Sequence, residues 1–242
     1  MSIPVSQIYI TDKPTELPPL LQHRSNSVKA AYPNCDYTLY NGEMLRSFIE
    51  REFDREVVTA FDRLRPYAYK SDLGRYCLLL KKGGWYFDIG VLVTVGISFP
   101  DNIVMLVFRE ASRLAGTTWA VLPGIIYSKP ANIVFQKAIE LIISNCKSNY
   151  YGLTAICPTG PNLFGEALAL TRLKEGVVVG DFMDLTPTHQ IKNRAFVLPN
   201  GTIFAWSKPS QGGDLQTLGG RGTNNYNSFW QTRTVYEPEI SK

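Results

Sequence analysis

The sequence predicts an α/β fold: one domain, residues 1–242, whose helices pack on a mixed, mostly parallel central sheet. Three observations predict it. A chain of 242 residues suffices for one such domain and needs no disulfide or metal to bury a core. Residues 7–52 alternate strand-like and helix-like segments, an order that calls for crossover helices between parallel strands. Further on, a helical segment ends at a Gly-Gly pair and leads into a long apolar run.

The opening β-α-β-α order is read from short patterns separated by turn residues. Residues 7–10 are apolar, aromatic and β-branched, and a Thr-Asp-Lys-Pro run ends this strand. Apolar positions recur at helical spacing in residues 20–32, whereas residues 36–40 alternate as a strand that stops at an Asn-Gly pair. A helix predicted at 43–52 completes the unit.

The strongest helix signal lies at residues 67–81, where apolar side chains recur on one face. Gly83 and Gly84 follow, as glycine should just past a helix C-terminus. Aromatic and β-branched residues dominate the next segment, 85–95, which is therefore predicted as one buried, central strand.

The remainder of the chain continues the alternation in shorter segments. Strands are predicted at 104–108, 125–127, 177–179 and 195–198, and helices at 132–146 and 162–171. From Ser207 onward Gly, Asn and Gln are frequent, so residues 207–242 are predicted as a loop and tail that ends in an aromatic segment.

Composition excludes several classes of protein. Hydrophobic residues make up 45% of the chain and charged residues 19%, which excludes a disordered protein. The net charge is only +4 and the basic residues are dispersed, so no nucleic-acid partner is expected. The four cysteines lack C-x-x-C spacing and predict reduced thiols. With no signal-peptide pattern and no apolar run of about 20 residues, the expected location is the cytoplasm, with at most peripheral contact at a membrane surface.

Asp88 is the first residue that points to a site. A carboxylate in an apolar strand is costly unless a partner compensates it. It is either a satisfied strand-end aspartate or a ligand group at the C-terminal edge of the sheet, where open α/β sheets place ligand sites. Gly90, two residues on, would let a ligand approach the backbone closely.

Asp72 and Arg75 lie three residues apart on the preceding helix and share one of its faces. A surface ion pair is the simplest interpretation. The tight Gly-Gly connection, however, makes helix and strand antiparallel neighbours, so Asp72, Arg75 and Asp88 are expected to converge on one pocket. Two acids and a guanidinium suit a ribose and a diphosphate.

Residues 67–91, YAYKSDLGRYCLLLKKGGWYFDIGV, resemble the signature of the family 32 "DXD" sugar-binding glycosyltransferases, a group with fungal α-1,6-mannosyltransferases and bacterial polysaccharide transferases. They are similar also to the glucosylating domains of the large clostridial toxins. In these families a helix with Ser-Asp-x-x-Arg-Tyr leads through Gly-Gly into a strand that ends in Asp-x-Asp. Residues 31–40, 159–161 and 228–230 look like further family segments. The resemblance implies a single GT-A type, Rossmann-like glycosyltransferase domain that binds a nucleotide sugar.

The resemblance also implies a donor site. Its residues are Tyr9, Ser71, Asp72, Arg75, Tyr86, Asp88, Gly90, Asn225, Ser228 and Trp230. Tyr9 would stack on the nucleotide base. Asp72 and Arg75 would hold the donor sugar and its ribose or phosphate, and Asp88 would contact the ribose and the water shell of a metal; these three are the catalytic candidates. Residues 207–242 would close over the donor site, with Ser228 and Trp230 touching the diphosphate.

Two departures from the family pattern concern the metal. The second acid of the motif, which usually ligates Mn²⁺ or Mg²⁺, is here Gly90, and a third acid found in the toxins is here Asn225. Hard divalent cations bind mainly through carboxylate oxygens, so at most a weak site at Asp88 and Asn225 is expected, which an acid placed at position 90 should tighten. Arg221 or Arg233 could supply positive charge instead.

The remaining candidates receive structural interpretations. His23 is expected to be solvated on a helix, and His189 to have a structural role in a loop. Trp119 and Trp206 are expected in the core rather than as platforms for an acceptor. Gly124 stands where many family members have asparagine, which leaves the donor sugar open.

The predicted function is transfer of a hexose from a UDP- or GDP-linked sugar to a glycan or lipid-linked glycan, with retention at the anomeric carbon, in polysaccharide biosynthesis. An inverting transferase on the same fold is one alternative, and product stereochemistry separates the two. A degenerate, non-catalytic module that binds nucleotide sugar or glycan is the other, and Gly90 and Asn225 favour it.

Overall fold

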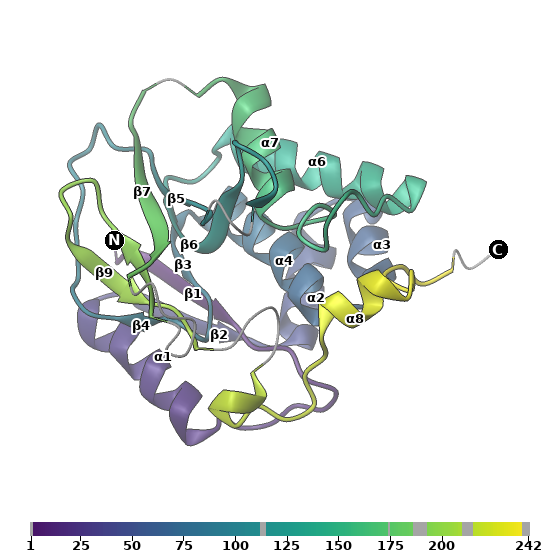
Figure 1. Cartoon of the computed structure of the whole chain (residues 1–242), viewed down its shortest axis with the longest axis horizontal. Helices are drawn as coiled ribbons and strands as arrows, with labels where there is room; N and C mark the ends of the chain where they lie inside the picture. Colours follow the sequence, from purple (N-terminus) through teal and green to yellow (C-terminus); the bar gives the residue numbers. More distant parts are fainter. Residues whose placement is uncertain (1, 112–114, 174, 186–192, 210–214, 239–242) are drawn as a thin grey trace.

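The computed structural model describes residues 2–111, 115–173, 175–185, 193–209 and 215–238. In this part of the chain nine strands form one mixed sheet, in the order β2-β1-β3-β6-β5-β7-β8-β9-β4 (Figure 1). The strands are β1 (Pro4–Ile8), β2 (Asp36–Tyr40), β3 (Gly84–Phe87), β4 (Leu92–Val93), β5 (Met105–Arg109), β6 (Val121–Ser128), β7 (Val177–Asp184), β8 (Arg194–Val197) and β9 (Ile203–Trp206). The helices are α1 (Pro19–Ala31), α2 (Gly42–Glu52), α3 (Arg55–Arg63), α4 (Tyr67–Lys82), α6 (Ile133–Ser148), α7 (Pro161–Thr171) and α8 (Tyr226–Gln231), with a 3-10 turn η1 at Gln216–Leu218.

The predicted α/β class with a mixed sheet is confirmed, but the sheet is not mostly parallel. Of the strand pairs in the described residues, β1–β2, β1–β3 and β5–β7 are parallel and the other five are antiparallel. A parallel pair needs a crossover of about a dozen residues or more, which here is helical and follows β1, β2 and β6. The shorter connections after β5, β7 and β8 return the chain antiparallel.

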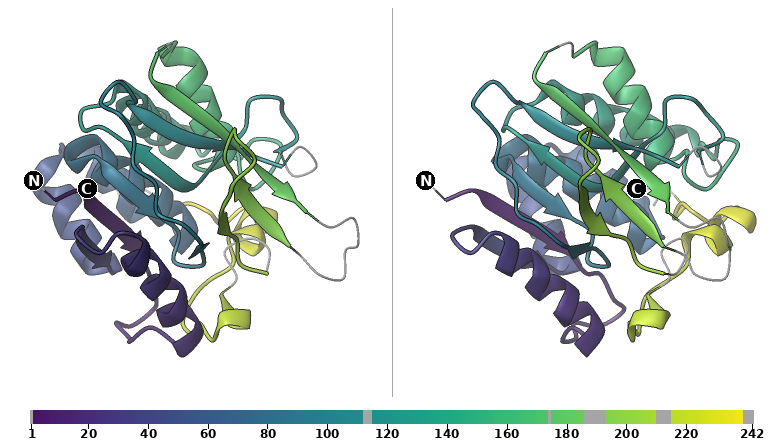
Figure 2. Two further views of the ribbon diagram at one scale, coloured as in Figure 1. Left: turned by 90° about the vertical axis from the view of Figure 1, so that its left-hand side faces the viewer. Right: turned by 60° about the vertical axis from the view of Figure 1, so that its left-hand side comes forward.

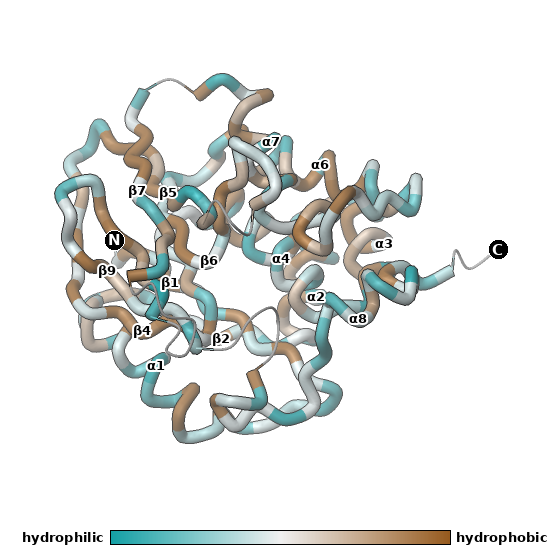
Figure 3. Tube along the Cα trace, in the orientation of Figure 1, coloured by the Kyte–Doolittle hydropathy of each residue, from teal (hydrophilic) through white to brown (hydrophobic). Residues whose placement is uncertain are grey.

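The sheet separates two hydrophobic cores, because successive side chains of a strand point to opposite faces. On β3, Tyr86 faces the core shared with α2, α3, α4, α6 and α7, whereas Trp85 and Phe87 face the core shared with Val28 of α1 and Phe204 of β9. Figure 2 accordingly shows α1 apart from the group of the other long helices. Hydrophobic residues follow the central strands β5 and β6 in Figure 3, as expected for strands buried on both faces.

The Gly-Gly turn fixes how α4 leads into β3. Gly83 and Gly84 both have positive φ, 64° and 81°, a conformation that favours glycine. A Cβ on Gly84 would lie 2.1 Å from the carbonyl oxygen of Pro4, so only glycine lets β3 pair directly beside β1.

The run 85–95, predicted as one strand, is divided in two. β3 ends at Phe87, residues 88–91 form a turn in which the Val91 N–H donates to the Asp88 carbonyl at 3.0 Å, and β4 then pairs with β9 at the far edge of the sheet. Both halves are buried, so apolar periodicity does not reveal the break. Asp88 and Gly90 are the residues that mark it.

Candidate functional site

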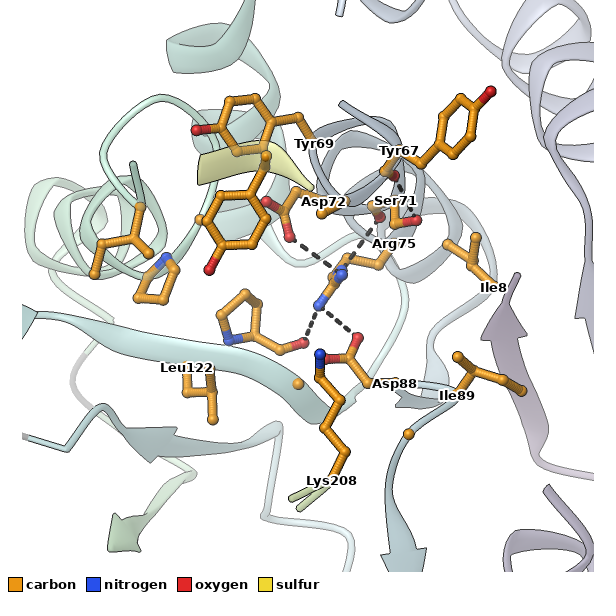
Figure 4. A pocket seen from close by; sticks show the side chains of 18 of the residues that line it. Ile8, Tyr67, Tyr69, Ser71, Asp72, Arg75, Asp88, Ile89, Leu122 and Lys208 are labelled. Carbon is orange, nitrogen blue, oxygen red and sulfur yellow. Dashed lines mark hydrogen bonds and ion pairs between the residues drawn. The ribbon is translucent and has the colours of Figure 1, made fainter. Parts of the chain in front are cut away.

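A cavity of about 410 Å³ opens at one edge of the sheet (Figure 4). This volume lies in the range of small-molecule sites, roughly 300–1,000 Å³. Strand directions place the carboxyl ends of β1, β3, β5, β7 and β9 at this edge, where α/β sheets bind ligands. Its polar and charged lining includes Ser71, Asp72, Arg75, Asp88, Glu110, Arg194, Lys208, Thr223 and Asn224.

Asp72 and Arg75 reach the cavity from α4. Nη2 of Arg75 lies 3.1 Å from Oδ1 of Asp72, and the side chains are only 6% and 10% exposed, respectively. The Thr159 hydroxyl donates to Oδ2 of Asp72 at 2.7 Å. Their shared helix face is therefore a buried one, and the interpretation as a surface ion pair is wrong.

Asp88 reaches the same point from the end of β3. Its Oδ1 lies 3.0 Å from Nη1 of Arg75 and accepts a hydrogen bond from the Tyr86 hydroxyl at 2.9 Å. The Asp88 side chain is 42% exposed, so much of its carboxylate faces the cavity. The structure thus brings Asp72, Arg75 and Asp88 together, as the helix–Gly-Gly–strand spacing predicts, with Arg75 bridging a buried acid and an open one (Figure 4).

The Arg75 guanidinium is also anchored by neutral groups. Nη1 donates to the Pro123 carbonyl at 2.7 Å and Nε to the Ser71 carbonyl at 3.2 Å. The guanidinium carbon lies 4.5 Å from the centre of the Tyr86 ring. A cation held on all sides in this way has little freedom to leave the two acids, so it fixes where the Asp88 carboxylate points.

Burial sets the protonation of the cluster. It raises the pKa of Asp72 to about 6, although Arg75 and the Thr159 hydroxyl both favour the charged carboxylate. It also raises the pKa of Tyr86 well above its usual value, so this phenol stays protonated and donates to Asp88. Burial alone would lower the pKa of Arg75, but the attraction of the Asp88 and Asp72 carboxylates outweighs it and the pKa rises.

The turn that carries Asp88 is held by four hydrogen bonds. The Asp88 N–H donates to the Gly124 carbonyl at 2.8 Å, and the Val91 N–H closes the turn on the Asp88 carbonyl. From the sheet, Nε2 of buried Gln7 donates to the Asp88 carbonyl at 3.3 Å. From α1, Nη1 of Arg24 donates to the Gly90 carbonyl at 2.7 Å. The Asp88 carboxylate therefore projects from a fixed backbone.

Tyr9 lies just after β1 and lines the cavity. Tyr9 is only 4% exposed and packs with Leu21, Ile89 and Leu218. The hydroxyl is buried with no hydrogen-bond partner among the described residues. Stacking of Tyr9 on a base stays a prediction.

The tail meets the cavity through residues other than those selected from the sequence. Asn225 caps α8, where its Oδ1 accepts from the Asn227 N–H at 3.0 Å. Trp230 donates from Nε1 to the Tyr151 carbonyl at 2.8 Å, and neither it nor Ser228 nor Asn225 lines the cavity. The tail residues that do are Ser207, Lys208, Leu215, Thr223, Asn224, Tyr226 and Asn227.

The two arginines proposed as substitutes for a metal also lie off the lining of the cavity. The Arg233 guanidinium covers the rings of Tyr151 and Trp230, at 4.6 Å and 4.8 Å from their centres. Arg221 is not among the lining residues either. Positive charge at the cavity therefore comes from other side chains.

Sequence reasoning missed three charged residues of the lining: Glu110, Arg194 and Lys208. Glu110 directly follows β5, Arg194 begins β8, and Lys208 lies two residues after β9, all at the same edge of the sheet. A search for charged residues at the ends of predicted strands would have found Glu110. It would have missed Lys208, because β9 was not predicted.

The residues that the structure describes do not form a divalent-cation site from protein ligands alone. Within the described ranges no group of three or more His, Cys, Asp or Glu side chains could hold a metal ion. Position 90 offers no side chain, the Asn225 amide oxygen is used in capping α8, and Oδ1 of Asp88 already contacts Arg75 and Tyr86. One remaining carboxylate oxygen is a poor site for a hard cation unless a diphosphate supplies further oxygen ligands.

The other residues considered lie away from the cavity. His23 is exposed on α1, as expected, and His189 lies outside the described residues. Trp119, expected in the core, is 52% exposed. Its backbone, not its ring, packs inward, because a Cβ on Gly165 of α7 would lie 1.8 Å from the Trp119 carbonyl oxygen. Trp206 is half-buried in β9.

Comparison with known proteins identifies the segment that holds Asp72, Arg75 and Asp88. Residues 18–106 match the family model described as "Glycosyltransferase sugar-binding region containing DXD motif". These residues are similar to the sugar-binding region of the DXD glycosyltransferases. Part of this DXD region, α4 through the turn at 88–91, lines the cavity, and the match supports the family predicted from the sequence.

Two relatives extend the similarity beyond the DXD region. An uncharacterized glycosyltransferase of Acanthamoeba polyphaga mimivirus is 26% identical over 166 residues, which are 68% of this chain and 63% of that protein. The chain thus spans less than two thirds of the length of this relative. The solved structure of the PaToxG glycosyltransferase has a similar fold, with a TM-score of 0.53 and 18% identity over 70% of this chain and 69% of the other. The predicted enzyme class, a glycosyltransferase, is that of the matched family and of both relatives.

In the parts of the chain that the structure describes, no helix has both the length and the apolar character needed to cross a bilayer.

Proposed function

We propose that the protein is a glycosyltransferase that moves a hexose from a UDP- or GDP-linked sugar to a glycan or lipid-linked glycan acceptor. The observation that carries the proposal is the position of Arg75, which contacts Asp72 at 3.1 Å and Asp88 at 3.0 Å on the wall of a cavity that the DXD region lines in part. The half-exposed Asp88 carboxylate is free on its cavity side to accept hydrogen bonds from ribose or sugar hydroxyls.

The reaction exchanges one bond of the anomeric carbon for another. The bond from that carbon to the β-phosphate oxygen of the donor breaks, and the electron pair stays on the oxygen. The acceptor hydroxyl oxygen forms the new bond, and its proton passes to solvent. Catalysis then consists mainly of stabilising the leaving diphosphate and orienting the sugar, and Arg75, by fixing Asp88, serves the second task.

Three finer parts belong to the same proposal. Retention of anomeric configuration rests on the resemblance of residues 67–91 to the retaining toxin domains. A tail over the donor site is supported by lining residues such as Lys208, Thr223 and Asn224. A role in polysaccharide assembly, with the acceptor on a lipid carrier at a membrane surface, is supported by the mildly basic chain, whose net charge is +4.

The direct test follows release of UDP or GDP from UDP-glucose, UDP-galactose and GDP-mannose, with the anomer of any product assigned by NMR. Asp88→Asn should abolish release. Asp181→Asn is the matched control, because Asp181 forms an exposed ion pair with Arg109 at 2.7 Å and does not line the cavity. An inverted anomer would favour the inverting alternative, and nucleotide binding without turnover would favour the non-catalytic module.

A further inference from the structure

The space beside Gly90 is filled by another side chain. A Cβ built on Gly90 would lie 3.1 Å from Cδ, 3.3 Å from Cβ and 3.5 Å from Cγ of Lys208. The aliphatic stem of Lys208 therefore occupies the volume in which an acidic side chain at position 90 would begin. The absence of an acid at position 90 leaves room for the Lys208 stem, which packs against Gly90.

The charged end of Lys208 lies at the cavity. Figure 4 shows the side chain rising past the turn at 88–91, with its amine directed toward the Asp88 carboxylate. Both residues line the cavity. A cation at this point lies on the same side of the cavity as the first acid of the motif, near where the families that Asp72, Arg75 and Asp88 resemble hold their metal through the second acid.

The sheet holds Lys208 in place. It lies two residues after β9, and the preceding Ser207 N–H donates to the Arg194 carbonyl of β8 at 2.8 Å. Nη2 of Arg194 in turn donates to the Lys208 carbonyl at 3.3 Å. The backbone that presents the amine is thus continuous with a paired strand, which is the rigidity a binding group requires.

We propose that Lys208 replaces the divalent metal of the family and binds the donor diphosphate through its ammonium group, so that donor binding needs no metal. The inference deepens the proposed glycosyltransferase function and rests on it. It agrees with the lack of metal ligands around Asp88 and Gly90 described above. Electrostatics agrees with the inference, because an ammonium on the wall of the cavity repels a divalent cation and attracts a diphosphate.

This arrangement changes one expectation from the sequence. An acid placed at position 90 should not by itself tighten Mn²⁺ binding, since its Cβ would press on the Lys208 stem, 3.1 Å from Cδ, and its carboxylate would pair with the ammonium. Both positions must change together. The double variant Gly90→Asp/Lys208→Ala clears the stem and supplies the second acid, so it is the variant expected to acquire metal dependence.

The test is calorimetric titration of UDP and, separately, GDP into the protein, each in EDTA and in Mn²⁺. For the nucleotide that binds, the wild type should show dissociation constants within twofold in the two buffers. Lys208→Met keeps the stem on Gly90 but loses the charge, and it should bind the nucleotide about 10- to 100-fold more weakly, as for one charged hydrogen bond. The matching nucleoside should bind to Lys208→Met and to the wild type with equal affinity.

Two further variants extend the test. Lys208→Arg should restore nucleotide affinity, and Mn²⁺ should tighten nucleotide binding to Gly90→Asp/Lys208→Ala by tenfold or more.

Lys137→Met, on the exposed surface of α6, is the control for loss of a lysine charge and should bind as wild type does. A tenfold loss of wild-type affinity in EDTA would overturn the inference while leaving the glycosyltransferase proposal intact, and so would unchanged nucleotide binding by Lys208→Met. If Lys208→Met does not fold, the inference is tested by two other measurements. These are the affinity of the wild type in EDTA against Mn²⁺ and the affinity of Lys208→Arg. Wild type that binds neither UDP nor GDP in either buffer would refute the proposed function and this inference with it.

Discussion

Replacing Arg75 by methionine should destabilise the whole fold as well as the site. The guanidinium is almost inaccessible and contacts Asp72 at 3.1 Å and Asp88 at 3.0 Å. Removing one partner of a buried ion pair costs about 3–5 kcal/mol, because the other charge stays buried without compensation. For a chain of this length each kcal/mol lowers Tm by about 2–4 °C, so Arg75→Met should melt about 6–20 °C below wild type.

The assay is thermal unfolding followed by circular dichroism at pH 7.5. Arg46→Met is the matched control: Arg46 also contacts two acids, Asp62 at 2.8 Å and Glu50 at 3.3 Å, but on an exposed helix surface where such pairs contribute about 0–1 kcal/mol. Asp72→Asn combined with Arg75→Met should recover part of the loss, because it removes the uncompensated buried charge. Arg75→Met melting within about 2 °C of wild type would refute the argument that this cluster is buried and coupled.

Four further predictions concern the same site. Asp88→Asn should melt within a few degrees of wild type, because its side chain is 42% exposed, yet slow sugar transfer by about 100-fold or more; wild-type turnover would refute the carried-over role. The pKa of Asp72 is about 6 in the folded protein against an ordinary 3.8, so the folded state binds more protons between these values. Unfolding free energy from urea titrations should therefore fall as pH rises from about 4 to about 6, and Asp72→Asn should flatten that slope. Gly124→Ala should weaken nucleotide affinity in calorimetry, because its Cβ would lie 3.1 Å from Oδ2 of Asp88; unchanged affinity would show that the carboxylate tolerates displacement. Arg24→Ala removes the 2.7 Å hydrogen bond to the Gly90 carbonyl and should speed amide hydrogen exchange in residues 88–91 but not in α6.

The part of the site that the sequence predicts is the part set by local geometry. Asp72, Arg75 and Asp88 lie within 17 residues on a helix, a glycine turn and a strand end, so their meeting follows from spacing alone. The resemblance to the DXD families rests on these same residues, which explains why family and fold class were also predictable. Read without the Gly-Gly connection, Asp72 and Arg75 suggested a surface ion pair, since burial of α4 depends on α6 and α7 packing over it.

What the sequence did not predict depends on the order of strands in the sheet. Lys208 reaches Gly90 only because β9 pairs with β4, and both strands are too short to carry a clear alternating pattern. The same limit applies to the antiparallel majority of the sheet. In the tail, the family pattern suggested direct roles for Asn225 and Trp230, whereas a six-residue helix uses the first as its cap and turns the second toward Tyr151.

The turn at 88–91 connects strands that occupy the third and the ninth positions of the sheet. The strand that pairs with β4 is β9, which lies more than 100 residues further along the chain. Pairings between such distant segments close large loops and form late in folding. On the ribosome, α4 and β3 can pack against β1 early. β4, which follows the turn, has no strand to pair with until β9 has been synthesised. Lys208 emerges two residues after that strand, so a nascent chain gains the partner of β4 and the cation of the site in the same short interval of synthesis.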